Sequence, residues 1–244
     1  MKTIDKTNLD QLAVSAIRAM CIDITNKAKS GHPGMPLGSA PILYTLYKNH
    51  LIANPHDPNW INRDRFVLSA GHASALLYAM LHITGFDLSI DELKAFRQID
   101  SLTPGHPEYR HTKGVEATTG PLGQGIAQAV GIALAEQAVQ AQHVEGHKLI
   151  NHYTYCLCGD GCLQEGISQE AISFAGHQRL NKLILIYDAN KTTLDAPLEA
   201  SFSENVELRF LASNWNVLKV KDGNDLDAID RAISKAKKSS DYPT

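Results

Sequence analysis

The sequence contains no apolar run that approaches the roughly 20 residues needed for a membrane-spanning helix. Its first residues, 1–6, also lack the apolar stretch of a signal peptide. A formal net charge of −3 over 244 residues provides no basic surface for nucleic acid. With 43% hydrophobic and 20% charged residues, the composition is that of a globular protein, for which we expect a cytoplasmic location and neither nucleic-acid nor membrane partners.

Cysteine is also scarce, and three of the four cysteines cluster at Cys156, Cys158 and Cys162. A thiolate metal site would need a fourth soft ligand nearby, and Cys21 is remote in sequence. Strand alternation would place Cys156 and Cys158 on one face, where small thiols pack as apolar side chains. We therefore expect reduced structural cysteines rather than zinc ligands.

Residues 153–192 are the most informative stretch of the chain. Two apolar runs, 153–158 and 182–187, flank an amphipathic segment over about 163–178. This order predicts strand, helix, strand, with the two strands parallel.

Each of these strands should end in a polar turn, one at Asp160 and the other at Asn190, 30 residues further on (190 − 160). Parallel strands end at one edge of a sheet, which is where open α/β sheets bind ligands. Carboxylate and amide oxygens are hard donors that suit Mg²⁺ or Ca²⁺. A helix starting near Leu163 would direct its free N–H groups at the same edge. These features favour a phosphorylated ligand, a diphosphate above all.

The remaining pattern is that of one α/β domain over residues 1–244, without repeats or linkers. Residues 31–38 hold three glycines and two prolines, which we interpret as a loop that excludes a helix. Apolar periodicity predicts helices over about 8–28, 39–49, 73–84, 126–142 and 225–239, a shorter helix around Leu208, and strands over 65–69 and 215–220.

Three histidines, His32, His72 and His106, lie in Gly- or Pro-rich loops at plausible ligand edges. On base rates a histidine is a surface or satisfied core residue, so any one of them alone is a weak indication of function. The long irregular stretch 100–123 leads into a small-residue helix and offers a second anion-friendly helix start. It is not GxGxxG and no clear strand precedes it, which argues against a dinucleotide site.

Gly159-Asp160-Gly161 followed by Asn190 resembles the thiamine-diphosphate motif, and residues 159–166 are similar to transketolase in particular. The resemblance covers essentially residues 8–244 and implies the thiamine-diphosphate-binding fold, a three-layer α/β/α domain with a mainly parallel central sheet. It favours transketolase over relatives of the pyruvate-dehydrogenase and deoxyxylulose-phosphate-synthase types. Four further strings resemble transketolase motifs in transketolase order: Ser30-Gly31-His32-Pro33-Gly34, Gly71-His72-Ala73, Thr103-Pro104-Gly105-His106-Pro107 and Thr119-Gly120-Pro121-Leu122-Gly123-Gln124-Gly125.

The resemblance also implies roles for individual residues. Glu165 and Glu170 resemble acidic residues of the family's subunit contact, although acids near a helix start are favourable without any such role. His32 and His106 would face the substrate, where imidazole suits proton transfer and hydroxyl recognition. The cation, Mg²⁺ or Ca²⁺, would be held by Asp160, the Asn190 side chain and the Thr192 backbone carbonyl, and thiamine diphosphate would be contacted by His72, Gly120, Leu122, Gly161, Glu165 and Asn190.

A complete transketolase continues into a pyrimidine-binding domain and a third domain, and nothing in this sequence matches either. The expected function is therefore the diphosphate-binding N-terminal part of a transketolase of the pentose phosphate pathway. It would move a two-carbon ketol unit from a ketose phosphate to an aldose phosphate. We expect no turnover by the chain alone. Its expected partners are a transketolase chain that carries the pyrimidine domain, a second copy of this chain in a dimer, or both.

Several alternatives stay open from the sequence. The chain could be a naturally split subunit, a truncated chain or a gene fragment. It could also be a non-catalytic binding or assembly module of the same fold, a component of another thiamine-diphosphate enzyme, or an unrelated phosphate-binding α/β protein.

Overall fold

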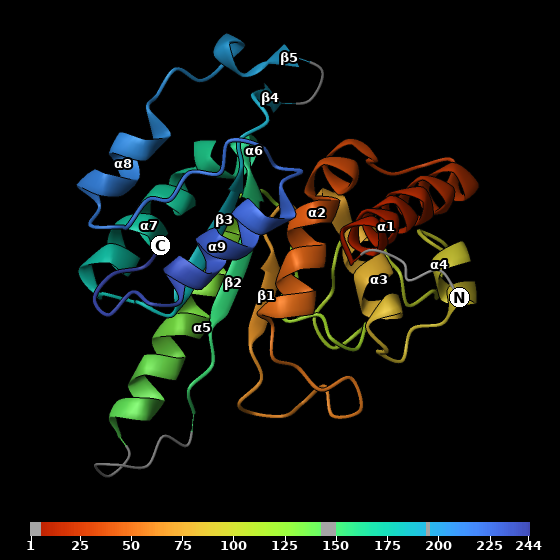
Figure 1. The fold of residues 1–244 in the computed structure, drawn as a ribbon, viewed down its shortest axis with the longest axis horizontal. Helices are drawn as coiled ribbons and strands as arrows, with labels where there is room; N and C mark the ends of the chain where they lie inside the picture. Colours follow the sequence, from red (N-terminus) through yellow and green to blue (C-terminus); the bar gives the residue numbers. More distant parts are fainter. Residues whose placement is uncertain (1–5, 143–149, 194–195) are drawn as a thin grey trace.

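A computed structural model describes residues 6–142, 150–193 and 196–244. Its central sheet consists of three parallel strands in the order β1-β2-β3 (Figure 1). These are β1 (Arg65–Leu68), β2 (Thr154–Gly159) and β3 (Leu183–Asp188). The predicted strand, helix, strand unit and its parallel pairing are thus confirmed.

The register of the sheet fixes where the two polar turns lie. Tyr155 of β2 pairs with Phe66 of β1 on one side and with Ile184 of β3 on the other. At the end of the strands, Gly159 pairs with Asp188. The ends of β2 and β3 are therefore level, and the residues that follow them leave the sheet at the same edge.

Helices cover both sides of the sheet, as Figure 1 shows. Helix α5 (Gln124–Ala141) contacts all three strands. On α2 (Gly34–Asn49), Tyr47 packs edge-on against Phe66 of β1, with 5.8 Å between the ring centroids. Just beyond α9 (Leu226–Ala236), the Lys237 carbonyl accepts a hydrogen bond from the Tyr153 hydroxyl at 2.8 Å. The α/β class with a parallel sheet is confirmed.

The other elements surround this framework and share one hydrophobic core with it. Helix α1 packs against α2 and α3, and α7 packs against α5. The remaining elements are α1 (Lys6–Ala28), η1 (Gly71–Ala73), α3 (Ser74–Ile83), α4 (Ile90–Lys94), α6 (Asp160–Gln164), α7 (Gly166–His177), β4 (Thr192–Thr193), β5 (Ala196–Pro197), η2 (Leu198–Ala200) and α8 (Val206–Ala212).

The prediction that residues 31–38 exclude a helix is wrong, because α2 already begins at Gly34. Pro36 falls in the first turn, where a backbone N–H has no intrahelical acceptor and its loss costs nothing. Pro41 lies inside the helix and cannot donate to the Leu37 carbonyl. Arg18 of α1 donates its Nε–H to that carbonyl at 2.8 Å instead, so the acceptor freed by the proline is satisfied.

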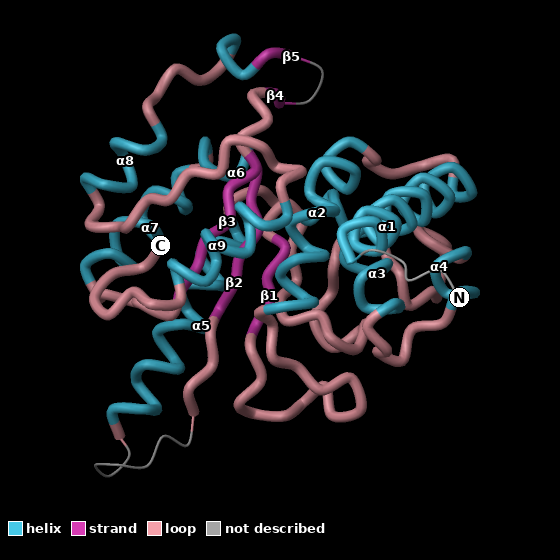
Figure 2. The backbone as a smooth tube through the Cα atoms, in the orientation of Figure 1, coloured by secondary structure: helices cyan, strands magenta, loops and turns pink. Residues whose placement is uncertain are grey.

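Two further expectations differ from the structure. The single helix expected over 163–178 is divided into α6 and α7, because Glu165 has extended backbone (ψ 139°). The strand expected over 215–220 is not a strand, and the segment between α8 and α9 is drawn as loop in Figure 2. In its place Thr244 pairs with β3, accepting from Leu185 N at 2.8 Å and donating to Leu183 O at 3.1 Å.

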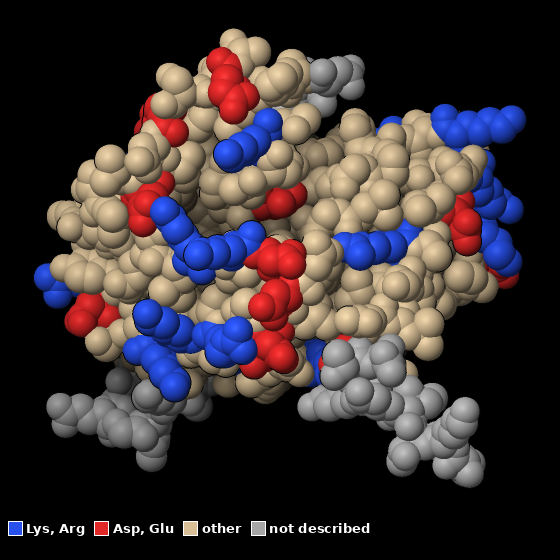
Figure 3. Space-filling model, turned by 45° about the horizontal axis from the view of Figure 1, so that its top comes forward, with Lys and Arg blue, Asp and Glu red and all other residues tan. Residues whose placement is uncertain are grey.

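The surface and the cysteines bear on what the chain can bind. Among the helices of the described residues, none combines the length and the apolar character of a membrane span. Lys and Arg side chains are interspersed with Asp and Glu on the face shown in Figure 3. Cys21, Cys156, Cys158 and Cys162 are all buried and unpaired by disulfides, as packed thiols should be.

Candidate functional site

Asp160 stands directly after β2 as the first residue of α6, and only 2% of it is exposed. Its Oδ1 accepts a hydrogen bond from the Tyr187 hydroxyl at the end of β3. Its Oδ2 is buried and has no hydrogen-bond partner among the described residues. A buried carboxylate oxygen without a partner is costly, and a cation at this position would compensate it.

Asn190 follows β3 by two residues, and both the oxygen and the nitrogen of its side-chain amide are hydrogen-bonded. Its Oδ1 accepts from Thr192 N at 2.9 Å, and its Nδ2 donates to Asp188 Oδ2 at 3.2 Å. Lys191 has a left-handed backbone (φ 59°), which lets the chain close this turn. Since α6 contacts β4, where Thr192 lies, the turn lies next to the helix that begins at Asp160.

The donors at this edge are chemically suited to a hard cation. Among the described residues, no group of three His, Cys, Asp or Glu side chains could hold a metal ion. Mg²⁺ does not need such a group, because it is usually bound through one or two carboxylates together with ligand phosphates and water. Asp160, the Asn190 amide and the Thr192 carbonyl offer one carboxylate and two neutral oxygens, which fits that pattern.

Tyr187 and Asp188 were not singled out from the sequence, yet both contact the predicted ligands. Burial, followed by the hydrogen bond to Asp160, raises the pKa of Tyr187, so its hydroxyl stays protonated and acts as a donor. Burial also raises the pKa of Asp188, the hydrogen bond from Asn190 opposes the rise, and the nearby Asp160 carboxylate adds to it. Their contacts follow from the register of β3 against β2, in which Asp188 pairs with Gly159, and no sequence pattern indicates them.

The three predicted histidines come together. The rings of His32 and His72 lie edge-on, with 5.3 Å between their centroids. His106 lies against the Gly120 turn, where a Cβ on Gly120 would be 3.3 Å from His106 Cγ. Burial, with His32 and His106 nearby, lowers the pKa of His72 to about 4. Partial desolvation, with Arg97 and His32 nearby, also lowers the pKa of His106, part of which is open to solvent.

The loop that precedes α5 joins the histidines to the cation edge. A Cβ on Gly71 would lie 2.8 Å from Gly120 N, so the turn after β1 touches this loop. A Cβ on Gly161 would lie 3.0 Å from Leu122 Cδ1, so the turn after β2 touches it as well. Gly123 has φ 80° and no room for a side chain beside Glu165, which makes glycine necessary there.

The beginning of α2 closes the same edge from the other side. Met35 lies 3.8 Å from the position of a Cβ on Gly159, and a Cβ on Gly38 would lie 3.9 Å from Asp188 Oδ2. The predicted residues therefore lie on turns that are neighbours in space. The start of α2 contacts the ends of β2 and β3, and the turn after β2 contacts the loop before α5. Glu165 and Glu170 are both exposed, and they stay available for contact with another chain.

The anion-binding helix N-terminus expected near Leu163 is weaker than the sequence suggested. The helix expected to present its N-terminus to a phosphate near Leu163 begins at Asp160 and has only five residues. Helix α5, with 18 residues, begins at Gln124 beside the Gly120 turn. Its free N–H groups are the better donors for an anion at this edge.

One known protein family matches this chain over almost its whole length. The model of "Transketolase, thiamine diphosphate binding domain" matches residues 9–244. This chain belongs to the transketolase family. The resemblance noted in its motifs is thereby confirmed along almost the whole chain.

Individual transketolases agree with this result. Transketolase of Geobacillus stearothermophilus is 56% identical over 238 residues, which are 97% of this chain and 36% of that protein. Transketolase of Staphylococcus aureus (strain MW2) is 58% identical over 236 residues, 96% of this chain and 35% of that protein. This chain thus spans little more than a third of the length of these transketolases.

The same relation holds for solved structures. The crystal structure of a transketolase from Pichia stipitis in complex with sedoheptulose-7-phosphate matches with a TM-score of 0.94 at 49% sequence identity. The match covers 96% of this chain and 35% of the transketolase chain. The likeness confirms the fold class and identifies this chain with the N-terminal part of transketolases.

Proposed function

We propose that this chain binds the diphosphate group of thiamine diphosphate together with Mg²⁺ or Ca²⁺, as the N-terminal part of a transketolase. In the assembled enzyme it would take part in the transfer of a two-carbon ketol unit from a ketose phosphate to an aldose phosphate. The observation that carries the proposal is the level ending of β2 and β3, which brings Asp160, with its unpartnered Oδ2, and Asn190 to one edge.

The cation would be held by Asp160, the Asn190 side chain and the Thr192 carbonyl. The N–H groups at the start of α5, the Gly120 turn and Gly161 would receive the diphosphate oxygens, with Leu122 beside them. His72, with its low pKa, is neutral at neutral pH and would offer a hydrogen bond without a charge. Glu165, at the exposed junction of α6 and α7, would also contact the cofactor.

Thiamine diphosphate, when bound, supplies the carbon nucleophile and the electron sink of the reaction. The protein's own part is proton transfer and orientation at the sugar. His32 and His106 would contact the substrate hydroxyl next to the scissile bond, and one of the two imidazoles would accept its proton. The lowered pKa of His106 keeps its imidazole unprotonated near neutral pH, which is the form that a base requires.

The chain spans little more than a third of its relatives, so its partners belong to the proposal as well. A transketolase chain with the pyrimidine-binding domain, self-association into a dimer, or both would complete the active site. Sugar phosphates would be the substrates, within the pentose phosphate pathway and in the cytoplasm. Residues 1–244 would act as a single diphosphate-binding domain.

Calorimetry with thiamine diphosphate tests the binding half of the proposal. We expect affinity that depends on Mg²⁺, and we expect Asp160→Ala to abolish the dependence because it removes the only carboxylate of the donor set. Asp91→Ala, at an exposed acid of α4, is the control and should bind as the wild type does. Binding that is equal with and without Mg²⁺, or equal in Asp160→Ala, would contradict the proposal.

A ketol-transfer assay tests the catalytic half. The chain alone should show no turnover, and activity should appear when a chain that carries the pyrimidine domain is added. His32→Ala and His106→Ala should then lower kcat while leaving Mg²⁺-dependent cofactor binding unchanged. A complex that binds the cofactor but stays inactive would instead identify a binding or assembly module.

A further inference from the structure

The end of β3 contacts both of the side chains that are proposed to hold the cation. Tyr187 donates its hydroxyl to Asp160 Oδ1, and Asp188 Oδ2 accepts from Asn190 Nδ2 at 3.2 Å. Tyr187 and Asp188 are adjacent in a strand, so their side chains point to opposite faces of the sheet. Tyr187 therefore holds Asp160 from one face of the sheet, and Asp188 holds Asn190 from the other.

We propose that Tyr187 and Asp188 are positioning residues, which orient Asp160 and Asn190 toward one cation and thereby set the affinity of the chain for it. This inference rests on the proposed function of the site. It goes further by assigning roles to two residues that supply no metal ligand themselves.

The hydrogen bonds of Asp160 determine which oxygen is left for the cation. The carboxylate is 2% exposed, so water cannot solvate it freely. Tyr187 occupies Oδ1, and Oδ2 is left without a partner. Without the hydroxyl, the carboxylate could rotate and both oxygens would lack a donor, so its orientation toward the cation would no longer be fixed.

Asn190 needs orientation for a different reason. An amide presents either its oxygen or its NH₂ group, and only the oxygen can bind a cation. Asp188 accepts from Nδ2, and Thr192 N donates to Oδ1. Both contacts favour the same rotamer of the amide, with the oxygen on the side of the β4 turn.

Replacing the partner of a metal ligand typically weakens metal affinity by about 10–100-fold. The direct test is titration of the full chain with Mn²⁺ at saturating thiamine diphosphate, in which the free ion is counted by electron paramagnetic resonance. Mn²⁺ prefers the same oxygen donors as Mg²⁺. The variant Tyr187→Phe removes only the hydroxyl, and we expect it to raise the Kd for Mn²⁺ by about tenfold or more.

Tyr153→Phe is the matched control, since it also removes one hydrogen-bonded tyrosine hydroxyl, the one that donates to the Lys237 carbonyl at 2.8 Å. It lies at the opposite end of the sheet and should leave the Kd for Mn²⁺ unchanged. A stability effect alone would appear in both variants as a lower Tm without metal. A Kd for Tyr187→Phe that is unchanged, or lower than that of the wild type, would overturn the role of Tyr187.

Asp188 is tested by two substitutions. Asp188→Ala should raise the Kd for Mn²⁺, because the Asn190 amide loses its acceptor. Asp188→Asn keeps an acceptor oxygen and should retain most of the affinity. Equal losses in both variants would show that Asp188 acts through its charge and would overturn its positioning role.

Asp160→Ala in the same titration separates this inference from the function on which it rests. If Asp160→Ala loses Mn²⁺ while Tyr187→Phe binds as the wild type does, the cation site stands and the role of Tyr187 is refuted. If Asp160→Ala binds Mn²⁺ unchanged, the proposed function and the inference both fail.

Discussion

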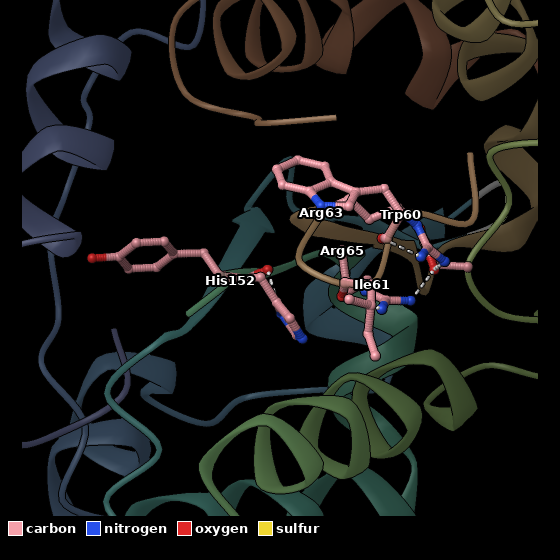
Figure 4. A network of polar contacts seen from close by, with 7 residues as sticks. Trp60, Ile61, Arg63, Arg65 and His152 are labelled. Atoms are coloured by element: carbon pink, nitrogen blue, oxygen red, sulfur yellow. Dashed lines mark hydrogen bonds and ion pairs between the residues drawn. The ribbon is translucent and has the colours of Figure 1, made fainter. Parts of the chain in front are cut away.

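Glu116 is the residue whose replacement we expect to cost the most stability through charge alone. Its side chain is 6% exposed and forms ion pairs with Arg63 and Arg65. Figure 4 shows these two arginines within their network of polar contacts. Arg63 donates to Oε1 at 2.6 Å through Nε and to Oε2 at 2.8 Å through Nη2, and Arg65 donates to Oε2 at 3.0 Å. The carboxylate is thus the shared partner of two largely buried guanidinium groups.

The variant Glu116→Ala leaves both guanidinium groups without their counter-charge. Removing one partner of a buried ion pair costs about 3–5 kcal/mol, because the other charge stays buried and uncompensated. The control is Glu207→Ala, which breaks the ion pair with Lys219, whose side chains are 38% and 67% exposed. Solvent screens such a pair, and its loss should cost less than about 1 kcal/mol.

Urea unfolding of the two variants measures both values. We expect a large fall of the midpoint for Glu116→Ala, a small fall for Glu207→Ala, and unchanged slopes in both. Losses of equal size in the two variants would refute the reasoning from burial and charge.

Three further predictions concern packing and titration. Gly176→Ala should destabilise the fold by about 1–3 kcal/mol or more, because its Cβ would overlap the Ser213 carbonyl. Gly166→Ala, with open space around it, should be neutral, and equal urea midpoints in the two variants would contradict this. The pKa values of His72 and His152 in the folded chain are both lowered to about 4, below their unfolded values. The free energy of unfolding should therefore rise between about pH 4 and 6.5, by at most about 1.4 kcal/mol per pH unit for each histidine and by less at half-buried His72. Urea midpoints that stay flat over this pH range would contradict the prediction. The buried cysteines should react with a thiol reagent only on unfolding, and fast labelling of the native chain would show that their burial is incomplete.

The elements around the cation edge could be predicted from the sequence because local and global signals agree there. The runs 153–158 and 182–187 are apolar enough to be buried strands, and the turns after them are polar. Their pairing follows from the connection through a helix. The position of Asp160 and Asn190 at one edge then needs no further information.

The differences arise where the tertiary structure overrides a local rule. The residues Gly34 to Gly38 belong to α2, and Pro36 is tolerated there because it falls in the first turn, a placement that composition cannot reveal. The break at Glu165 divides a segment whose apolar pattern runs on without interruption. Residues 215–220 have a strand-like pattern, but Thr244 is the residue that pairs with β3.

The partners of the predicted ligands could not be predicted from the sequence at all. Tyr187 and Asp188 occupy the end of an apolar run, where a tyrosine and an acid have no periodic signal. Their contacts with Asp160 and Asn190 depend on the register of β3 against β2 and on the geometry of the turn at Lys191. Such contacts are set by packing and become visible only in the structure.

A crystal of this chain with thiamine diphosphate and Mn²⁺ would test most directly whether two strand ends share one ion. Anomalous scattering locates the metal independently of the protein density. We predict a single peak bonded to Asp160 Oδ2 and Asn190 Oδ1, with cofactor phosphate oxygens as further ligands. A bound cofactor without an ion between those two side chains, or an ion bound elsewhere, would contradict the proposed site.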